Sequence, residues 1–99
     1  MPTKLIFDSF GPVNKPAIVF LHGGGSSAWS WHSVVEFLQE DFFCLVPDLP
    51  QHGRSIEVKP FGMERAADEI TSLIYAQVPA RKATIVGLSE GAQVGVSLC

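Results

Sequence analysis

A Gly-x-Ser-x-Gly motif at residues 87–91 (GLSEG) constrains the fold of this 99-residue chain more than any other feature. A short apolar run at 83–86 precedes it, and a run of mainly small residues at 92–96 follows it. Together they predict a buried strand that turns tightly into a helix, with glycines on both sides of the serine because no side chain fits there. Such a turn lifts the hydroxyl of Ser89 above the sheet and points the start of the helix at it.

Other apolar runs predict the remaining elements. Continuous runs at 17–21 and 42–46 are typical of strands that are buried on both faces, and a weaker alternation at 4–10 predicts a first, edge strand. Helical spacing predicts two helices, the first with Ser30 as its N-cap. Their core-facing residues would be Trp31, Val34, Val35 and Leu38 in the first helix, and Met63, Ala66, Ala67, Ile70 and Ile74 in the second.

Strands that alternate with helices predict an α/β fold, with a mostly parallel sheet and helices on its flanks. In such folds ligands bind beyond the carboxyl ends of the strands. Three distinctive segments stand at those ends, namely HGGG at 22–25, DLPQHGRS at 48–55 and GLSEG at 87–91. The three segments therefore predict one shared site.

These three segments, in this order, resemble the N-terminal part of the α/β-hydrolase-fold serine hydrolases. The resemblance implies hydrolysis of esters, lactones, amides or related acyl compounds, with a small-molecule acyl substrate and neither a metal nor an organic cofactor. It implies that Ser89 is the nucleophile and that the backbone N–H groups of Gly24 and Glu90 form the oxyanion hole. The residues that would support the motifs are His22, Gly23, Asp48, Gly87 and Gly91.

The other members of a catalytic triad are missing from this chain. In the family the acid and then the histidine follow the serine, and family members are more than twice as long. Here no acidic residue follows Glu90, and the three histidines (His22, His32 and His52) all precede the serine. A serine without a base is a weak nucleophile at neutral pH. We therefore expect residues 1–99 to be the N-terminal segment of a single domain, incomplete at its C-terminus and inactive alone.

Less specific interpretations compete with this one. The chain could be a genuine short, non-catalytic binding or regulatory module that pairs through the open edge of its sheet. Asp48 has the chemistry of a triad acid, although bracing of its loop is favoured. Trp29 and Trp31 are compatible with an acyl pocket, but packing at the start of a helix is favoured. His22 is expected to hydrogen-bond backbone atoms and to hold its loop.

Composition excludes several other classes of function. The net charge is −3 and no basic run exceeds the pair Arg81-Lys82, so nucleic acid is not an expected partner. The histidine spacing does not match a zinc site. Only three apolar residues separate Lys4 from Asp8, too few for a signal peptide or a membrane span, which predicts a cytoplasmic protein. Two cysteines, at 44 and 99, then predict reduced thiols.

Overall fold

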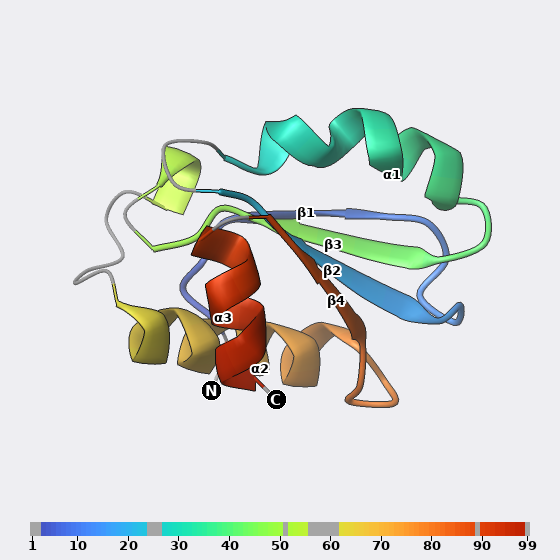
Figure 1. The fold of residues 1–99 in the computed structure, drawn as a ribbon. Helices are drawn as coiled ribbons and strands as arrows, with labels where there is room; N and C mark the ends of the chain where they lie inside the picture. The colour runs from blue at the N-terminus through green and yellow to red at the C-terminus, as the bar shows by residue number, and fades with distance from the viewer. Residues whose placement is uncertain (1–2, 24–26, 51, 56–61, 89, 99) are drawn as a thin grey trace.

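The computed structural model describes residues 3–23, 27–50, 52–55, 62–88 and 90–98. Within them, one sheet of four strands in the order β1-β3-β2-β4 has helices on both faces (Figure 1). The strands are β1 (Phe7–Phe10), β2 (Ala17–Leu21), β3 (Phe43–Pro47) and β4 (Thr84–Gly87). The helices are α1 (His32–Leu38), α2 (Met63–Gln77) and α3 (Glu90–Leu98), with 3₁₀ turns η1 (Ala28–Trp31) and η2 (Gly53–Ser55).

The sheet is mostly parallel, as the sequence predicts. Strand β2 lies at its centre and runs parallel to both β3 and β4, so Val19 faces Leu45 on one side and Ile85 on the other. Strand β1 is antiparallel to β3 and forms one edge. Because β2, β3 and β4 run in the same direction, their carboxyl ends lie together at one end of the sheet, next to the three motif segments.

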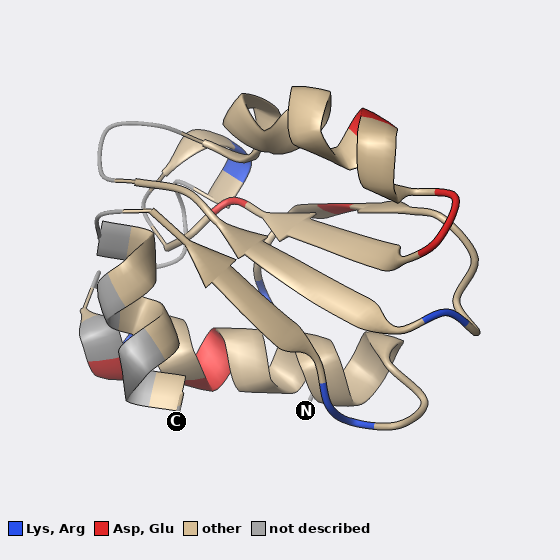
Figure 2. Ribbon diagram, turned by 45° about the vertical axis from the view of Figure 1, so that its right-hand side comes forward, with Lys and Arg blue, Asp and Glu red and all other residues tan. Residues whose placement is uncertain are grey.

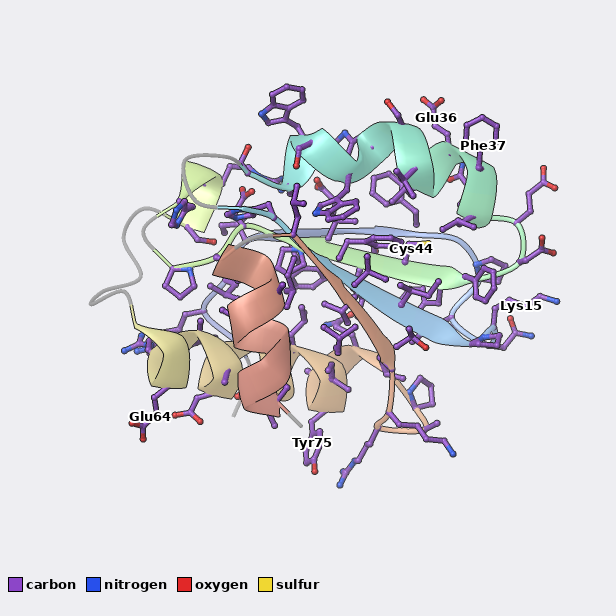
Figure 3. All side chains as sticks on the ribbon, in the orientation of Figure 1. Lys15, Glu36, Phe37, Cys44, Glu64 and Tyr75 are labelled. Atoms are coloured by element: carbon purple, nitrogen blue, oxygen red, sulfur yellow. The ribbon has the colours of Figure 1, made fainter. Side chains whose placement is uncertain are left out.

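Two apolar layers hold the helices to the sheet. The side chains of alternate residues of β2 pack into one layer or the other, as expected for a strand covered on both faces. Helices α2 and α3 cover a layer that contains Val19, Leu21, Leu45, Ala66, Ile70, Leu73 and Val94. Helix α1 covers the opposite layer, which contains Ile18, Phe20, Ala28, Val35, Cys44 and Val46 (Figure 3).

Strand β4 departs from the prediction that it is buried. Thr84 is exposed and Ile85 and Val86 are only half-buried. The reason lies in the strand order, which puts β4 at the edge of the sheet with β2 as its neighbour on one side. Strand β1 is also shorter than expected, since the N–H of Ile6 donates to Ser55 Oγ (2.9 Å) outside the strand pairing.

The start of α1 also differs from the prediction. Ser30 is not the N-cap but lies inside η1, where its hydroxyl donates to the carbonyl of Ser27 (2.9 Å). A 3₁₀ turn has three residues per turn instead of 3.6, which rotates the faces of the residues that follow. Trp31 packs on Phe20 as expected, with 5.2 Å between ring centroids, but Trp29 is 71% exposed.

Two further observations concern the sulfur chemistry and the helices. Cys44 is a buried free thiol, and burial raises its pKa. Cys99 lies outside the described residues. Among the described helices, none combines the length and the apolar character needed to span a bilayer.

Candidate active site

The carboxyl ends of β2, β3 and β4 bring the three motif segments together. Ser89 and Gly24, the predicted nucleophile and one predicted oxyanion donor, lie outside the described residues. Glu90, the other predicted donor, is the first residue of α3. The structure does describe the glycines on either side of Ser89, and neighbouring backbone atoms leave no space for a side chain on them.

Gly87 and Gly91 both stand where no side chain fits. A Cβ on Gly87 would lie 2.7 Å from the backbone N and Cα of Ala92, and a Cβ on Gly91 would lie 2.5 Å from the carbonyl oxygen of His22. Cβ atoms essentially never approach backbone so closely. The turn is tied to the sheet as well, because the N–H of Leu88 donates to the carbonyl of Leu21 (3.1 Å). Lack of space therefore explains why glycines flank this turn.

The imidazole of His22 joins the first motif segment to the second. Its side chain is fully buried. Nε2 lies 2.9 Å from the backbone nitrogen of Leu49 and accepts its hydrogen, so the neutral ring carries its proton on Nδ1. Nδ1 then donates to the carbonyl of Gly23 (2.8 Å). Both ring nitrogens are thus engaged with backbone atoms.

The carboxylate of Asp48 binds the loop that follows β2. Its side chain is buried; Oδ1 accepts from the N–H of Ala28 (2.6 Å), and Oδ2 accepts from the N–H (3.0 Å) and Nε (2.8 Å) of Arg54. Burial is the largest single influence on its pKa and acts to raise it, but the hydrogen bonds together outweigh burial and hold the pKa below its ordinary value. Gly53 has a φ of +48°, and a Cβ there would lie 2.9 Å from Asp48 Cγ.

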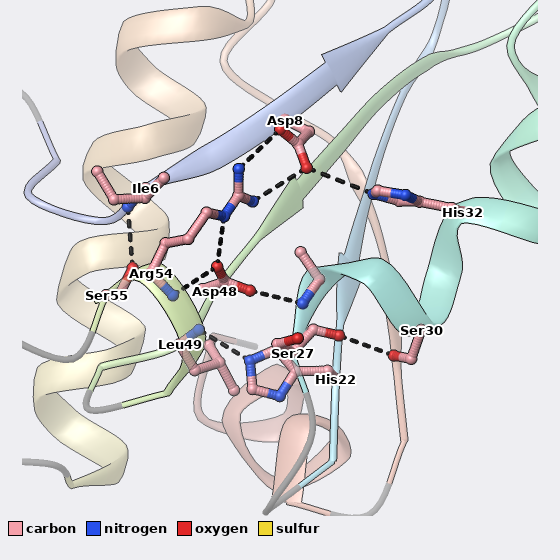
Figure 4. A network of polar contacts seen from close by, with 11 residues as sticks. Ile6, Asp8, His22, Ser27, Ser30, His32, Asp48, Leu49, Arg54 and Ser55 are labelled. Atoms are coloured by element: carbon pink, nitrogen blue, oxygen red, sulfur yellow. Dashed lines mark hydrogen bonds and ion pairs between the residues drawn. The ribbon is translucent and has the colours of Figure 1, made fainter.

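Arg54 connects Asp48 to the first strand (Figure 4). Its two terminal nitrogens each lie 3.0 Å from a carboxylate oxygen of Asp8, and His32 Nε2 lies 3.4 Å from the same carboxylate. The hydrogen bond from Arg54 lowers the pKa of Asp8, and the two carboxylates together raise the pKa of Arg54. The ionic chain Asp48–Arg54–Asp8 therefore links β3, the loop at 48–55 and β1.

Sequence reasoning missed Asp8, Arg54 and Ser55 as parts of this site. A charged residue in the middle of a mainly apolar strand was a signal for Asp8. Arg54 and Ser55 stood inside a motif that had already been singled out. What the sequence did not reveal is that β1 lies beside β3, which is the contact that brings Asp8 to Arg54.

A small cavity opens beside this ionic chain. Its volume is about 350 Å³, and it is lined by Asp8, Ser27, Trp29, His32, Asp48, Gly53 and Arg54.

The three donors described for Asp48 are backbone and guanidinium groups. This arrangement braces a loop and differs from that of an acid that orients a histidine. In the described part of the chain, no three or more His, Cys, Asp or Glu side chains gather as a metal site.

Comparison with known proteins agrees with this geometry. Residues 16–99 match the sequence model of the alpha/beta hydrolase fold. The chain belongs to the α/β-hydrolase fold family. It is 31% identical over 97 residues to an AB hydrolase superfamily protein of Gibberella zeae, covering 97% of this chain and 34% of that protein.

Two further proteins, a sequence relative and a solved structure, are also similar to this chain. A pimeloyl-(acyl-carrier protein) methyl ester esterase of Vibrio parahaemolyticus is 37% identical over 98 residues, covering 99% of this chain and 36% of the esterase. The structure of a thermophilic esterase from Thermogutta terrifontis superimposes with a TM-score of 0.86 at 29% identity, covering 95% of this chain and 34% of that one. The chain thus spans about a third of the length of the relatives it matches.

Proposed function

We propose that this chain carries the nucleophile and the oxyanion hole of a serine hydrolase. In this proposal Ser89 Oγ attacks an acyl carbonyl, and the N–H groups of Gly24 and Glu90 donate to the oxyanion that forms. The observation that carries the proposal is the crowding at Gly91, where a Cβ would collide with the carbonyl oxygens of Leu21 and His22. Such crowding supports a nucleophile elbow, the tight turn from β4 into α3, that is pressed against the loop that follows β2. In that geometry both donors face one oxygen.

The proton of the Ser89 hydroxyl needs a base, and the contacts that the structure gives the described histidines join them to other groups. His22 donates from Nδ1 and accepts at Nε2, so neither nitrogen is free to take a proton from serine. His32 faces Asp8. His52 has Nδ1 3.0 Å from the carbonyl of Pro50. We therefore propose that residues 1–99 form the N-terminal segment of a single hydrolase domain, whose C-terminal part supplies the acid and the histidine.

The proposed substrates are small acyl compounds with an ester or lactone bond. The esterases similar to this chain support that class, and position 89 is a serine, which suits an acyl-enzyme mechanism. The reaction as proposed needs no metal or organic cofactor. A cytoplasmic setting stays a prediction from the sequence.

The test begins with the coding nucleic acid beyond the codon for Cys99. We expect an open frame that supplies an acidic residue and then a histidine, and a product that hydrolyses short p-nitrophenyl esters. Ser89→Ala should lower kcat by about four to six orders of magnitude in that product, whereas Ser33→Ala, on the exposed side of α1, should not change it. The 99-residue chain should show no saturable hydrolysis, and turnover by it that Ser89→Ala abolishes would refute the proposed inactivity.

The exposed edge of β4 favours a second candidate function. Thr84 is exposed and Ile85 and Val86 are half-buried, and among the described residues β4 pairs with β2 alone, so its other edge is open to a further strand. A short non-catalytic module would use it to bind a partner by β-augmentation. A stop codon directly after Cys99, together with stable monomeric behaviour of the chain, would favour this candidate over the hydrolase.

A further inference from the structure

A second, larger hollow lies at the opposite end of the sheet from the motif segments. It is an open groove of about 690 Å³ between the turn at 13–17 and the segment at 78–84. Ala17 and Thr84, which line it, are the first residues of β2 and β4. The groove is therefore at the amino ends of these strands, while residues 22–23 and 87–91 are at their carboxyl ends. Its volume is within the range usual for small-molecule sites.

The groove is positively charged in a chain that is negative overall. Lys15 and Lys82 line it, and the described residues that line it include no aspartate or glutamate. Neither lysine takes part in an ion pair with another described residue. Figure 2 shows their basic segments on two turns at the same end of the sheet. Figure 2 also shows acidic residues on the turn that enters β3 at this end, and the net charge of the chain is −3, so the positive charge is a feature of the groove lining alone.

The neighbouring cation, Arg81, is held outside the groove. Its guanidinium lies over the ring of Tyr75, 5.2 Å from the centroid, and it does not line the hollow. Its φ of +55° is unusual for a residue with a side chain. Because Arg81 is turned toward Tyr75, the adjacent Lys82 is the member of the pair that faces the groove.

The rest of the lining is mainly apolar. Val13, which is 52% exposed, lies on one side, and Val78 and Pro79 lie on the other. Asn14 and Thr84 add polar side chains. A phosphate dianion would lose much of its hydration against such walls, whereas a monoanion with an apolar body matches both the charge and the walls.

We propose that this groove binds an amphipathic monocarboxylate. The carboxylate would lie between Lys15 and Lys82, and its apolar chain would lie along Val13, Val78 and Pro79. This site is separate from the one proposed for ester hydrolysis, and its occupation does not depend on Ser89. The sequence singled out the pair Arg81-Lys82, but only the fold places Lys15 from a distant turn beside it.

The test is a titration of the ¹⁵N-labelled product of the complete open frame with octanoate, followed by amide chemical shifts. Shifts are expected at 13–17 and 78–84, and not at 91–95 in α3. Octanamide has the same apolar chain without the charge and should bind about tenfold more weakly, and inorganic phosphate should not compete. The double variant Lys15→Gln/Lys82→Gln should weaken octanoate binding by a similar factor.

Lys4→Gln is the matched control, since it removes one positive charge from an exposed residue that does not line the groove. It should leave octanoate binding unchanged. Val13→Asp, at an exposed position, adds a carboxylate to the groove and should abolish binding even if the double variant fails to fold. Equal binding of octanoate and octanamide, loss of binding in Lys4→Gln, or binding that survives Val13→Asp in a folded chain would overturn the proposal.

Discussion

The turn at 87–91 and the loop at 48–55 lie at the same end of the sheet but are held in different ways. The turn depends on missing side chains, since Gly87 and Gly91 leave no space for a Cβ beside neighbouring backbone. The loop depends on charge, since Asp48 and Arg54 bind each other, the backbone of Ala28 and the side chain of Asp8. Steric contacts between uncharged groups do not respond to titration or to charge screening, whereas ionic hydrogen bonds respond to both. The same site therefore combines one element that pH and ionic screening leave unchanged with one that they alter.

The largest effect is expected from Gly91→Ala. Its Cβ would meet the carbonyl oxygens of Leu21 and His22, which are backbone atoms that move only with the strand. We expect a loss of about 3 kcal/mol in the free energy of unfolding, measured by urea denaturation. Gly62→Ala is the control because nothing lies within 4 Å of a Cβ there, and it should change stability by less than about 1 kcal/mol. Equal effects of the two substitutions would show that the turn is not sterically closed.

A somewhat smaller effect is expected from Asp48→Asn. The amide keeps the shape of the carboxylate, but it has only one oxygen for the three donors and leaves Arg54 without its buried partner. We expect a loss of about 2 kcal/mol in the free energy of unfolding. Asp68→Asn, on the exposed side of α2, should have almost no effect. If the two variants have the same stability, the ionic chain does not hold the loop.

The pH dependence of stability separates the two regions directly. Asp48 and Asp8 have pKa values below their ordinary range in the folded protein, so the unfolded chain binds more protons at acidic pH. Their contribution is complete above the unfolded pKa of about 4 and is lost as the pH falls through the folded values. Denaturation at a series of pH values should show this loss, and Arg54→Gln should reduce it. Gly91→Ala should lower stability equally at every pH, and a changed acid slope in that variant would contradict the division.

The smallest effect is expected from Asp8→Asn, at the exposed end of the ionic chain. Asp8 and Arg54 are both partly exposed, with 30% and 47% of their side chains accessible. A pair of that kind contributes about 0.5 kcal/mol, and salt weakens it. The variant and the parent should therefore converge in stability as salt is added. A large effect that persists in high salt would place Asp8 among the structural determinants of the loop.

Local patterns in the chain were enough to predict most of the elements, and three ordered segments carried the resemblance to the family. The spacing of Ala66, Ile70 and Ile74 predicted the buried face of α2, and all three are buried. The continuous run at 17–21 predicted the central strand with its bounds. These inferences succeed because the signals depend on residues that are close together in the sequence. This holds for helix and strand periodicities and for the small residues that a tight turn requires.

Other features came only from the way distant segments meet in the folded chain. Asp8 reaches Arg54 because β1 lies beside β3, and Lys15 shares a groove with Lys82 because β2 lies beside β4. The half-exposure of β4 and the exposure of Trp29 have the same origin, since burial depends on which element lies opposite. Periodicity specifies which face of an element is apolar, but strand order and long-range packing specify what that face meets.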